Sequence, residues 1–461
     1  MFDLKDIAQE DVHLFSYREL NILLDVNSGS IHVLDDAASD LFQAVMDKED
    51  MDTIIDKYGE AAGQEAYQQL LAIQAEGLLG SKTDLDADSL LQKASYIKSL
   101  CLHVSHDCNL RCKYCFAGTG DFGGDRQLMS IDTAKKAIDF LLEASGPRPF
   151  CEVDFFGGEP LMNFDVVKDA VIYAKEASRK IGKEIRLTLT TNGMLLNEQV
   201  RRFLVEHKIK LVLSLDGRAE VNDFMRPTVS GRGSYERIIP NFQSMVEELD
   251  GMDYYLRGTY TKHNLDFSHD VEHMAGLGFR ELSVEPVVAP EKEAYAISEE
   301  DFSALSEEYD RLVDLYLDYQ QKGDPFNFFH FNINLEQGPC LSKRLRGCGA
   351  GFEYLAVTPR GDLYPCHQFV GQTEFCLGNV REGVKNKNIS RTFKNTHIFN
   401  KKECPRCWAR FYCSGGCNAN AYQQSGDLLT PYKTECLVQK KRLECAIYLE
   451  VKRILLAEGE F

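Results

Sequence analysis

The sequence of 461 residues contains no run of about 18 or more apolar residues, so it predicts no transmembrane helix. It also lacks any tract of basic residues, and its formal net charge is −19, which argues against nucleic acid and anionic membranes as partners. The start, MFDLKDIAQEDVHLF, lacks the basic and apolar stretches of a secretory signal, so we expect a cytoplasmic protein. The composition, 44% apolar and 27% charged, is typical of globular domains.

Cysteine, by contrast, is abundant, with 15 residues in the chain. In a large chain without a secretory signal, this number favours metal or redox chemistry over disulfide bonds. Ten of these cysteines lie in the loop-rich last part, beyond about residue 339. The spacing of the cysteines therefore carries most of the functional information.

Residues 1–85 are expected to form a small module of their own. Apolar alternation in VHLF and ILLDV predicts two strands, NSGS is typical of a turn, and IHVL predicts a returning strand. Three helical patterns follow in AASDLFQAVMD, MDTIIDKYG and AYQQLLAIQAEGLL. Strands followed by about three helices indicate a winged-helix-like module, and a plain cap on the larger domain is the alternative.

The segment 96–300 alternates short apolar stretches with helical patterns. The predicted strands are 100–104, 151–156, 185–191, 210–216, 254–261 and 281–287. Such βα units predict an α/β fold with a parallel sheet, open or closed as a barrel, and functional residues at the carboxyl ends of the strands. A helical connector over 301–338 and a loop-rich domain over 339–461 complete the predicted order.

Three cysteines follow the first predicted strand in the stretch CNLRCKYCFAGTG, at Cys108, Cys112 and Cys115. Thiolates are soft ligands that suit zinc or iron–sulfur clusters. A structural zinc site would need a fourth protein ligand, whereas three thiolates on a cluster of four irons leave one iron free for an amine and a carboxylate. Taken alone, the motif leaves a zinc loop or buried thiols as alternatives.

The spacing C-x3-C-x-aromatic-C, with Tyr114 as the aromatic residue, resembles the signature of the radical S-adenosylmethionine (SAM) enzymes. The resemblance implies that the three cysteines are the catalytic cluster ligands and that a [4Fe–4S] cluster binds SAM. It also implies cleavage of SAM to a 5′-deoxyadenosyl radical that abstracts a hydrogen atom, and a partial (β/α)6 barrel.

Three more motifs end successive predicted strands, namely FFGGEP, TTNG and SLDG. They resemble the SAM-pocket segments of the same family, where glycines admit a close backbone and a carboxylate suits the SAM amino group. We expect Arg226 in NDFMRP to pair with the SAM carboxylate, because a guanidinium group fits a carboxylate. The alternative is that Arg226 forms a surface salt bridge. The cofactor-binding residues so predicted are Tyr114, Gly157, Gly158, Glu159, Pro160, Thr191, Asn192, Ser214, Asp216 and Arg226.

The C-terminal cysteines resemble the SPASM domain, an iron–sulfur extension of radical SAM enzymes that modify peptides and proteins. The resemblance implies two auxiliary [4Fe–4S] clusters, hence three clusters in all. The distal set would be Cys404, Cys407, Cys413 and Cys436, and the proximal set Cys348, Cys366 and Cys417. For the fourth proximal ligand, Cys340 and a thiolate of the substrate are alternatives. Four cysteines fit no motif and are expected to be buried thiols: Cys101, Cys151, Cys376 and Cys445.

The long stretch CLHVSHDCNLRCKYCFAGTGDFGGDRQLMS resembles the SCIFF (six cysteines in forty-five) maturases. This implies an enzyme that forms thioether (sactionine) bonds, from a cysteine sulfur to an acceptor α-carbon, in a ribosomally made precursor peptide. The peptide leader would add a strand to the N-terminal module, and a flavodoxin or ferredoxin would supply electrons.

Two other functions are alternatives. Formylglycine formation by an anaerobic sulfatase maturase is one, although those relatives have aspartate where His367 follows Cys366. A zinc-stabilised peptide carrier without enzymatic activity is the other.

Overall fold

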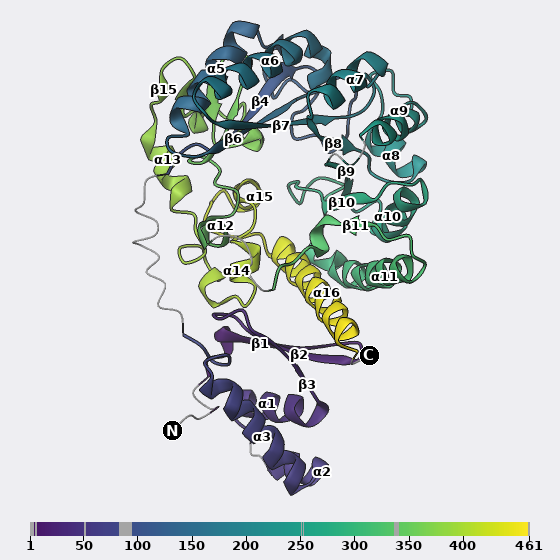
Figure 1. The fold of residues 1–461 in the computed structure, drawn as a ribbon, viewed down its shortest axis with the longest axis vertical. Helices are drawn as coiled ribbons and strands as arrows, with labels where there is room; N and C mark the ends of the chain where they lie inside the picture. Colours follow the sequence, from purple (N-terminus) through teal and green to yellow (C-terminus); the bar gives the residue numbers. More distant parts are fainter. Residues whose placement is uncertain are drawn as a thin grey trace.

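The computed structural model describes residue 4 and residues 7–49, 52–82, 95–249, 251, 253–335 and 341–459. The N-terminal module lies at one end of the molecule, and the barrel lies at the other, with the C-terminal region between them (Figure 1). Cys340 lies outside the described residues. Within the described part, every helix is too short or too polar to cross a membrane.

The N-terminal module has a three-stranded antiparallel sheet in the order β1-β2-β3, followed by three helices. Its elements are β1 (Val12–Tyr17), β2 (Leu20–Asp25), β3 (Ile31–Leu34), α1 (Asp36–Asp47), α2 (Asp52–Tyr58) and α3 (Glu60–Ala75). The side chain of Asp25 holds the turn before β3 by accepting a hydrogen bond from Ser28 N at 2.8 Å. Asp35 caps α1 by accepting from Ala38 N at 2.7 Å. These elements coincide with the predicted strands, turn and helices.

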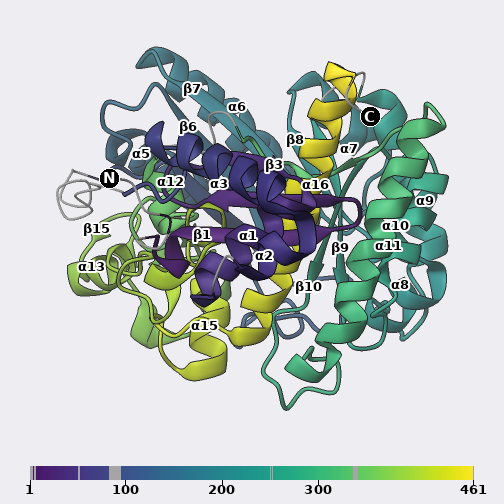
Figure 2. The same cartoon turned by 90° about the horizontal axis from the view of Figure 1, so that it is seen from below.

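The sheet of this module is covered on both faces. Leu23 and Leu34 pack with the module's own helices in a small separate core. Leu20, Ile22 and Leu24 belong instead to the main core of the molecule. Figure 2 shows the module lying in front of α16 (Lys433–Glu458) and the C-terminal region. The module is therefore docked on the rest of the chain and does not hang from a linker.

Six parallel strands form the barrel, in the order β4-β6-β7-β8-β9-β10. They are β4 (Ser99–His106), β6 (Phe150–Gly157), β7 (Glu184–Thr191), β8 (Lys210–Ser214), β9 (Tyr254–Tyr260) and β10 (Glu281–Pro286). The helices between the strands, and α11 after β10, lie outside the sheet (Figure 1), namely α5 (Ile131–Ala144), α6 (Phe164–Lys180), α7 (Glu198–Glu206), α8 (Ala219–Met225), α9 (Tyr235–Glu248), α10 (Phe267–Gly276) and α11 (Phe302–Gln321). All six predicted strands are confirmed, as is the α/β fold.

Side chains of the barrel strands alternate between the helical layer and the lumen. In β6, Val153 and Phe155 are buried in the main core, whereas Glu152, Asp154 and Phe156 are half-buried on the opposite side. That opposite side of a strand covered by helices is the barrel lumen. Polar residues of the strands therefore face inward.

The sheet continues past the barrel at both edges. At one edge β11 (Asn327–Phe328) joins β10, and at the other edge β12 (Tyr354–Val357) pairs in parallel with β4. Short strands complete the sheet, namely β5 (Gln127–Leu128), β13 (Asp362–Tyr364), β14 (Gly378–Asn379) and β15 (Gly383–Val384). The C-terminal region also contains α12 (Leu341–Arg346), α13 (Lys387–Lys394), α14 (Arg410–Cys413) and α15 (Asn418–Ser425). One sheet thus crosses the predicted limits of the barrel at residues 300 and 339.

Candidate functional site

The three-cysteine stretch forms a tight loop directly after β4. A methyl group on Gly120, whose φ is +93°, would lie 2.7 Å from Cβ of Cys108, so the loop closes only with glycine there. Burial, with a smaller contribution from nearby negative charges (Glu159 and Cys112 for Cys108, and Cys115 for Cys112), raises the pKa of the Cys108 and Cys112 thiols to about 12. The pKa of Cys115 is raised in the same way. Three thiols held together in this way need a cation before all can ionise, which fits a metal cluster.

The glycines of FFGGEP let the end of β6 approach this loop. A methyl group on Gly157 would lie 2.2 Å from the carbonyl oxygen of Ser105, and one on Gly158 would lie 2.3 Å from that of Asp107. The amide of Gly158 donates to Ser105 O at 2.8 Å. Their first role in the structure is thus to seat the cysteine loop.

Glu159 is buried, and its carboxylate faces other parts of the protein. One oxygen accepts hydrogen bonds from Leu161 N at 3.0 Å and from Thr191 Oγ1 at 2.8 Å. The other oxygen accepts from Asn192 N at 2.8 Å. Burial raises the pKa of Glu159 to about 7 despite these donors. The carboxylate therefore ties the end of β6, where Pro160 opens the 3-10 helix η3 (Pro160–Asn163), to the end of β7.

The TTNG turn after β7 also reaches the cysteine loop. Asn192 Nδ2 donates to Asn109 Oδ1 at 2.8 Å and lies 3.6 Å from Cys108 Sγ. Hydrogen bonds to ligand sulfurs are one means by which proteins tune iron–sulfur clusters. The turn thus lies beside the first cysteine of the set.

Tyr114, Asp216 and Arg226 form a buried polar group beside the loop. The Tyr114 hydroxyl donates to the Asp216 carboxylate at 2.7 Å and accepts from Arg226 Nη1 at 3.0 Å. Asp216 also accepts from Thr259 N at 3.1 Å, so this side chain positions its neighbours. Arg226 Nε is buried and has no hydrogen-bond partner among the described residues. This unpaired donor fits an added carboxylate such as that of SAM, and the burial of Arg226 excludes a surface salt bridge.

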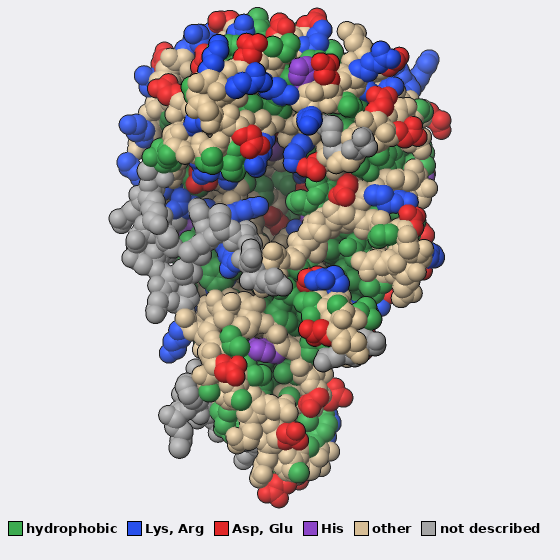
Figure 3. Space-filling model, in the orientation of Figure 1, with side chains coloured by type: hydrophobic (Ala, Val, Ile, Leu, Met, Phe, Trp, Pro, Cys, Tyr) green, Lys and Arg blue, Asp and Glu red, His purple; other side chains and the backbone are tan. Residues whose placement is uncertain are grey.

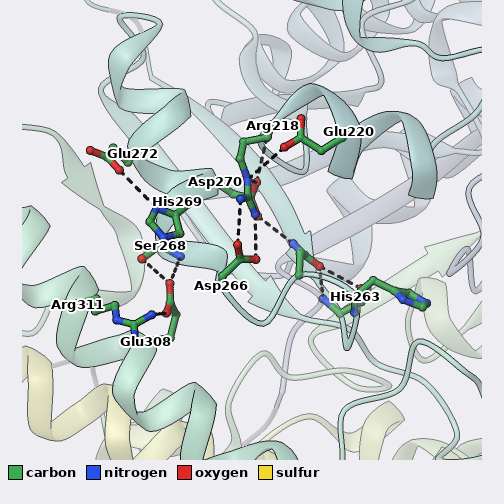
Figure 4. A network of polar contacts seen from close by, with 12 residues as sticks. Arg218, Glu220, His263, Asp266, Ser268, His269, Asp270, Glu272, Glu308 and Arg311 are labelled. Atoms are coloured by element: carbon green, nitrogen blue, oxygen red, sulfur yellow. Dashed lines mark hydrogen bonds and ion pairs between the residues drawn. The ribbon is translucent and has the colours of Figure 1, made fainter.

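The SLDG turn is held from outside by a second network (Figure 4). Asp270 of α10 is fully buried and accepts from Arg218 N at 3.0 Å, from Arg218 Nε at 2.8 Å and from Asn264 Nδ2 at 3.1 Å. The outer side of Arg218 pairs with Asp266 at 2.9 Å. Ser214, at the end of β8, is half-buried. The network fixes the backbone from which Asp216 projects.

The charges of four C-terminal cysteines, Cys404, Cys407, Cys413 and Cys436, act on one another. Burial and mutual charges raise the pKa of Cys404 to about 11 and that of Cys413 and Cys436 to about 12, with Cys407 as a further contributor. Among the described residues, no three His, Cys, Asp or Glu side chains are placed to hold a single metal ion, as a structural zinc site requires.

The second set is that of Cys348, Cys366 and Cys417. Burial raises the pKa of Cys366, and the charges of Cys417 and Cys348 raise it further. Glu435 accepts from Cys417 N at 2.9 Å and directly precedes Cys436, so one residue joins the two sets.

His367, which follows Cys366, lies between Phe116 and Phe156, with both ring centroids at 5.2 Å. Its Nδ1 is 3.0 Å from the hydroxyl of Tyr354 on β12. Burial lowers the pKa of His367 to about 4, so the ring is neutral near pH 7. The proximal region thereby packs directly against the cysteine loop after β4.

Two residues of this neighbourhood escaped the sequence analysis. Asp154 faces the lumen from β6, and Tyr354 lies beside it on β12. The available signal was an aspartate inside an otherwise apolar strand, EVDFF. Its meaning depends on which strands flank it, and a sequence motif does not contain that information.

Comparison with known proteins gives two domain matches. Residues 102–258 match the radical SAM superfamily, and residues 348–408 match SPASM, an iron–sulfur cluster-binding domain. The cysteine-type anaerobic sulfatase-maturating enzyme of Clostridium novyi is 24% identical over 347 residues, which cover 70% of this chain and 89% of that enzyme.

Solved structures resemble the chain over most of its length. The structure of anSMEcpe with bound AdoMet has a TM-score of 0.66 at 20% identity and covers 79% of this chain and 96% of its own. That of Streptococcus suis SuiB bound to precursor peptide SuiA has a TM-score of 0.54 at 17% identity and covers 93% and 99%. At these identities the likeness concerns the fold. The chain carries a radical SAM domain and a SPASM domain.

Proposed function

We propose that this radical SAM enzyme of the SPASM type acts on a ribosomally made, cysteine-rich precursor peptide. Within this peptide, the enzyme would form intramolecular thioether bonds between a cysteine sulfur and the α-carbon of an acceptor residue. Each bond requires the loss of one S–H hydrogen and one Cα–H hydrogen. The proposal needs a hydrogen-abstracting cofactor, a place for the sulfur and a means of holding the peptide.

The observation that carries the proposal is the proximal set of Cys348, Cys366 and Cys417. A [4Fe–4S] cluster takes four ligands, and the described residues supply three here. The thiol of Cys366 lies near Cys101, whose strand lines the lumen. A substrate cysteine in the lumen could therefore be the fourth ligand, and Cys340 is the alternative.

The cofactors of the proposal are SAM and three [4Fe–4S] clusters. Cys108, Cys112 and Cys115 would hold the SAM-binding cluster, and Arg226 Nε would receive the SAM carboxylate. When bound, SAM and its cluster supply the hydrogen abstraction. The protein's own residues hold and orient the reactants around the lumen. A flavodoxin or ferredoxin would be the electron donor.

The N-terminal module would bind the leader of the precursor. Within the described residues, β3 pairs with β2 on one side only, so its outer edge offers unpaired backbone groups. Val33 on β3 is 43% exposed. An extended peptide can add to such an edge as a further strand. SuiB, which shares the fold, has been solved with its precursor peptide SuiA.

Figure 3 shows a hollow between the barrel and the C-terminal region, and we propose that the peptide substrate binds there. Acidic, basic and hydrophobic side chains all surround it in that view. Formylglycine formation remains the competing function because of the sulfatase-maturating relative. His367 argues against it, since a neutral ring bound to Tyr354 stands after Cys366 in place of an aspartate.

The test is anaerobic incubation of the enzyme with SAM, a reductant and a cysteine-rich peptide, followed by tandem mass spectrometry. The expected product has lost two hydrogens per bridge, with sulfur retained. Replacement of Cys108, Cys112 and Cys115 by alanine should abolish it. Cys340→Ala should preserve bridging if the substrate thiolate is the fourth ligand. A product that has lost sulfur would instead indicate formylglycine.

A further inference from the structure

Asp154 occupies an unusual place for a carboxylate, in the middle of β6. Its strand neighbours Val153 and Phe155 are buried toward the helices, so Asp154 points into the lumen. In the sheet register it stands between Cys101 of β4 and Thr188 of β7. An aspartate is among the residues least favoured in strands, and its burial lowers stability unless other groups compensate.

The surroundings of this carboxylate compensate only in part. Cys101 from β4 is its register partner, and Cys101 and Thr190 from β7 both act to lower its pKa. Arg257 from β9 faces it as the nearby cation, and Glu152 is the other charged group on its own strand. One carboxylate oxygen, Oδ1, is buried without any hydrogen-bond partner among the described residues. Burial raises the pKa of Asp154 to about 7, although Arg257 acts to lower it.

A single residue, Cys101, separates Asp154 from Cys366 of the proximal set. Cys101 touches Asp154 and lies near Cys366, and Tyr354 on β12 adjoins both Cys101 and Asp154. The other candidate acceptor, His367, already has its Nδ1 against the Tyr354 hydroxyl.

We propose that Asp154 is the base that accepts the thiol proton of the substrate cysteine at the proximal set. The S–H bond breaks heterolytically, the proton passes to the carboxylate of Asp154, which is half-buried as a whole, and the sulfur keeps the electron pair. In the complete reaction the acceptor's α-hydrogen leaves as an atom to the SAM-derived group. The S–Cα bond then forms, and one electron passes to an auxiliary iron–sulfur cluster. This inference rests on the proposed thioether-forming function.

The first test compares Asp154→Asn with the wild-type holoenzyme across pH. Asparagine keeps the shape but cannot take a proton, so bridging near pH 7 should fall about 100-fold, as general bases typically contribute. The deficit should shrink toward about pH 9, because a free thiol ionises unaided near pKa 8.5. The wild-type rate should rise with pH through about 7, where Asp154 ionises.

Glu152→Gln is the matched control, since it removes one carboxylate from the same face of the same strand. It should retain the rise in rate near pH 7, moved to slightly lower pH, because the charge of Glu152 raises the pKa of Asp154. Iron content and SAM cleavage without peptide should match the wild type in both variants, because Asp154 acts on the substrate alone. If Asp154→Asn loses iron, Asp154→Glu replaces it and should retain the rise in rate near pH 7.

Three results would overturn the assignment. These are an Asp154→Asn enzyme that bridges at the wild-type rate near pH 7, a wild-type profile without a rise there, and a Glu152→Gln profile as altered as that of Asp154→Asn. Failure of the wild type to bridge any peptide, with SAM cleavage intact, would contradict the proposed function instead. The two failures are therefore distinguishable.

Discussion

Arg410 and Glu10, which are 400 residues apart in the chain, are joined by a hydrogen bond of 2.7 Å from Arg410 Nη1 to the Glu10 carbonyl oxygen. Nη2 of the same arginine donates to Asp11 at 3.0 Å and to Asn27 Oδ1 at 2.7 Å. Its side chain is 4% exposed and belongs to α14, between Cys407 and Cys413. The N-terminal module is thus seated on the loop that carries Cys407 and Cys413.

Replacing Arg410 by alanine should loosen this seat. Glu10, Asp11 and Asn27 would each lose a hydrogen bond from Arg410. Removal of one partner of a buried ion pair, here Arg410–Asp11, costs about 3–5 kcal/mol. Hydrogen exchange over β1 and β2 should accelerate, and the melting temperature should fall. Arg406→Ala is the control, because Arg406 is exposed. Equal effects of the two variants would contradict the docking role of Arg410.

Gly158→Ala should disrupt the three-cysteine loop. The added methyl group would lie 2.3 Å from the Asp107 carbonyl oxygen, and this backbone contact cannot be relieved by a rotamer change. We expect loss of iron from this site, measured as iron per protein and as visible absorbance after anaerobic reconstitution. At Gly124 the nearest atom would be 3.7 Å away, so Gly124→Ala should keep its iron. Full iron content in Gly158→Ala would refute the argument.

Arg226→Lys tests the proposed carboxylate partner in the SAM pocket. Lysine keeps the charge but lacks the guanidinium fork and its free Nε, so the affinity for SAM should drop by about 1.5–3 kcal/mol, the value of a hydrogen bond to a charged group. Calorimetric titration of the reconstituted enzyme measures this loss. Arg232→Lys, at an exposed arginine of the same loop, serves for comparison. Unchanged SAM affinity in Arg226→Lys would remove Arg226 from the pocket.

Asp270→Ala should weaken the SLDG turn from a distance. The fully buried carboxylate accepts four hydrogen bonds, and its removal should lower the free energy of unfolding by about 3 kcal/mol. Asp266→Ala, at a partner that is 47% exposed, should cost under about 1 kcal/mol. Chemical denaturation of both variants measures the difference, and comparable losses would show that burial does not set the strength of the network.

The pH dependence of stability follows from Asp154. Its pKa in the folded protein is about 7, against an ordinary value of 3.8, so the protonated form is favoured by folding. This contribution to stability is complete below the ordinary pKa and is lost as pH rises through about 7. It amounts to at most about 4 kcal/mol. Urea unfolding of the cluster-free protein should show this decline, and Asp154→Asn should make it shallower; part of the slope should remain, because the pKa of Glu159 is also raised to about 7. A steeper decline in the variant would be inconsistent with the burial of a proton on Asp154.

The barrel strands could be predicted because their apolar residues stand out locally, as in KLVLS and EIRLTLTT. The pairing of β12 with β4 could not, since YLAV is only four residues long and its partner lies far away in sequence. The grouping of the cysteines into sets came from the resemblance to known families, which their spacing carries. By contrast, Tyr114 is 102 residues away from Asp216 and 112 residues away from Arg226 in the chain. Sequence spacing does not reveal that these buried polar groups form hydrogen bonds. The same limit concealed Asp154, whose importance depends on Tyr354 arriving from β12.

The parallel pairing of β12 with β4 has a practical consequence for producing parts of this protein. A shortened chain that ends after the barrel would leave β4 as an edge strand. This strand is apolar: in the intact molecule its side chains Leu100 and Leu102 are fully buried. Such open, apolar edges recruit other strands and lead to aggregation. We therefore expect the barrel expressed without residues 341–459 to collect in inclusion bodies. Fragments for crystallisation or spectroscopy should keep the strand that seals this edge.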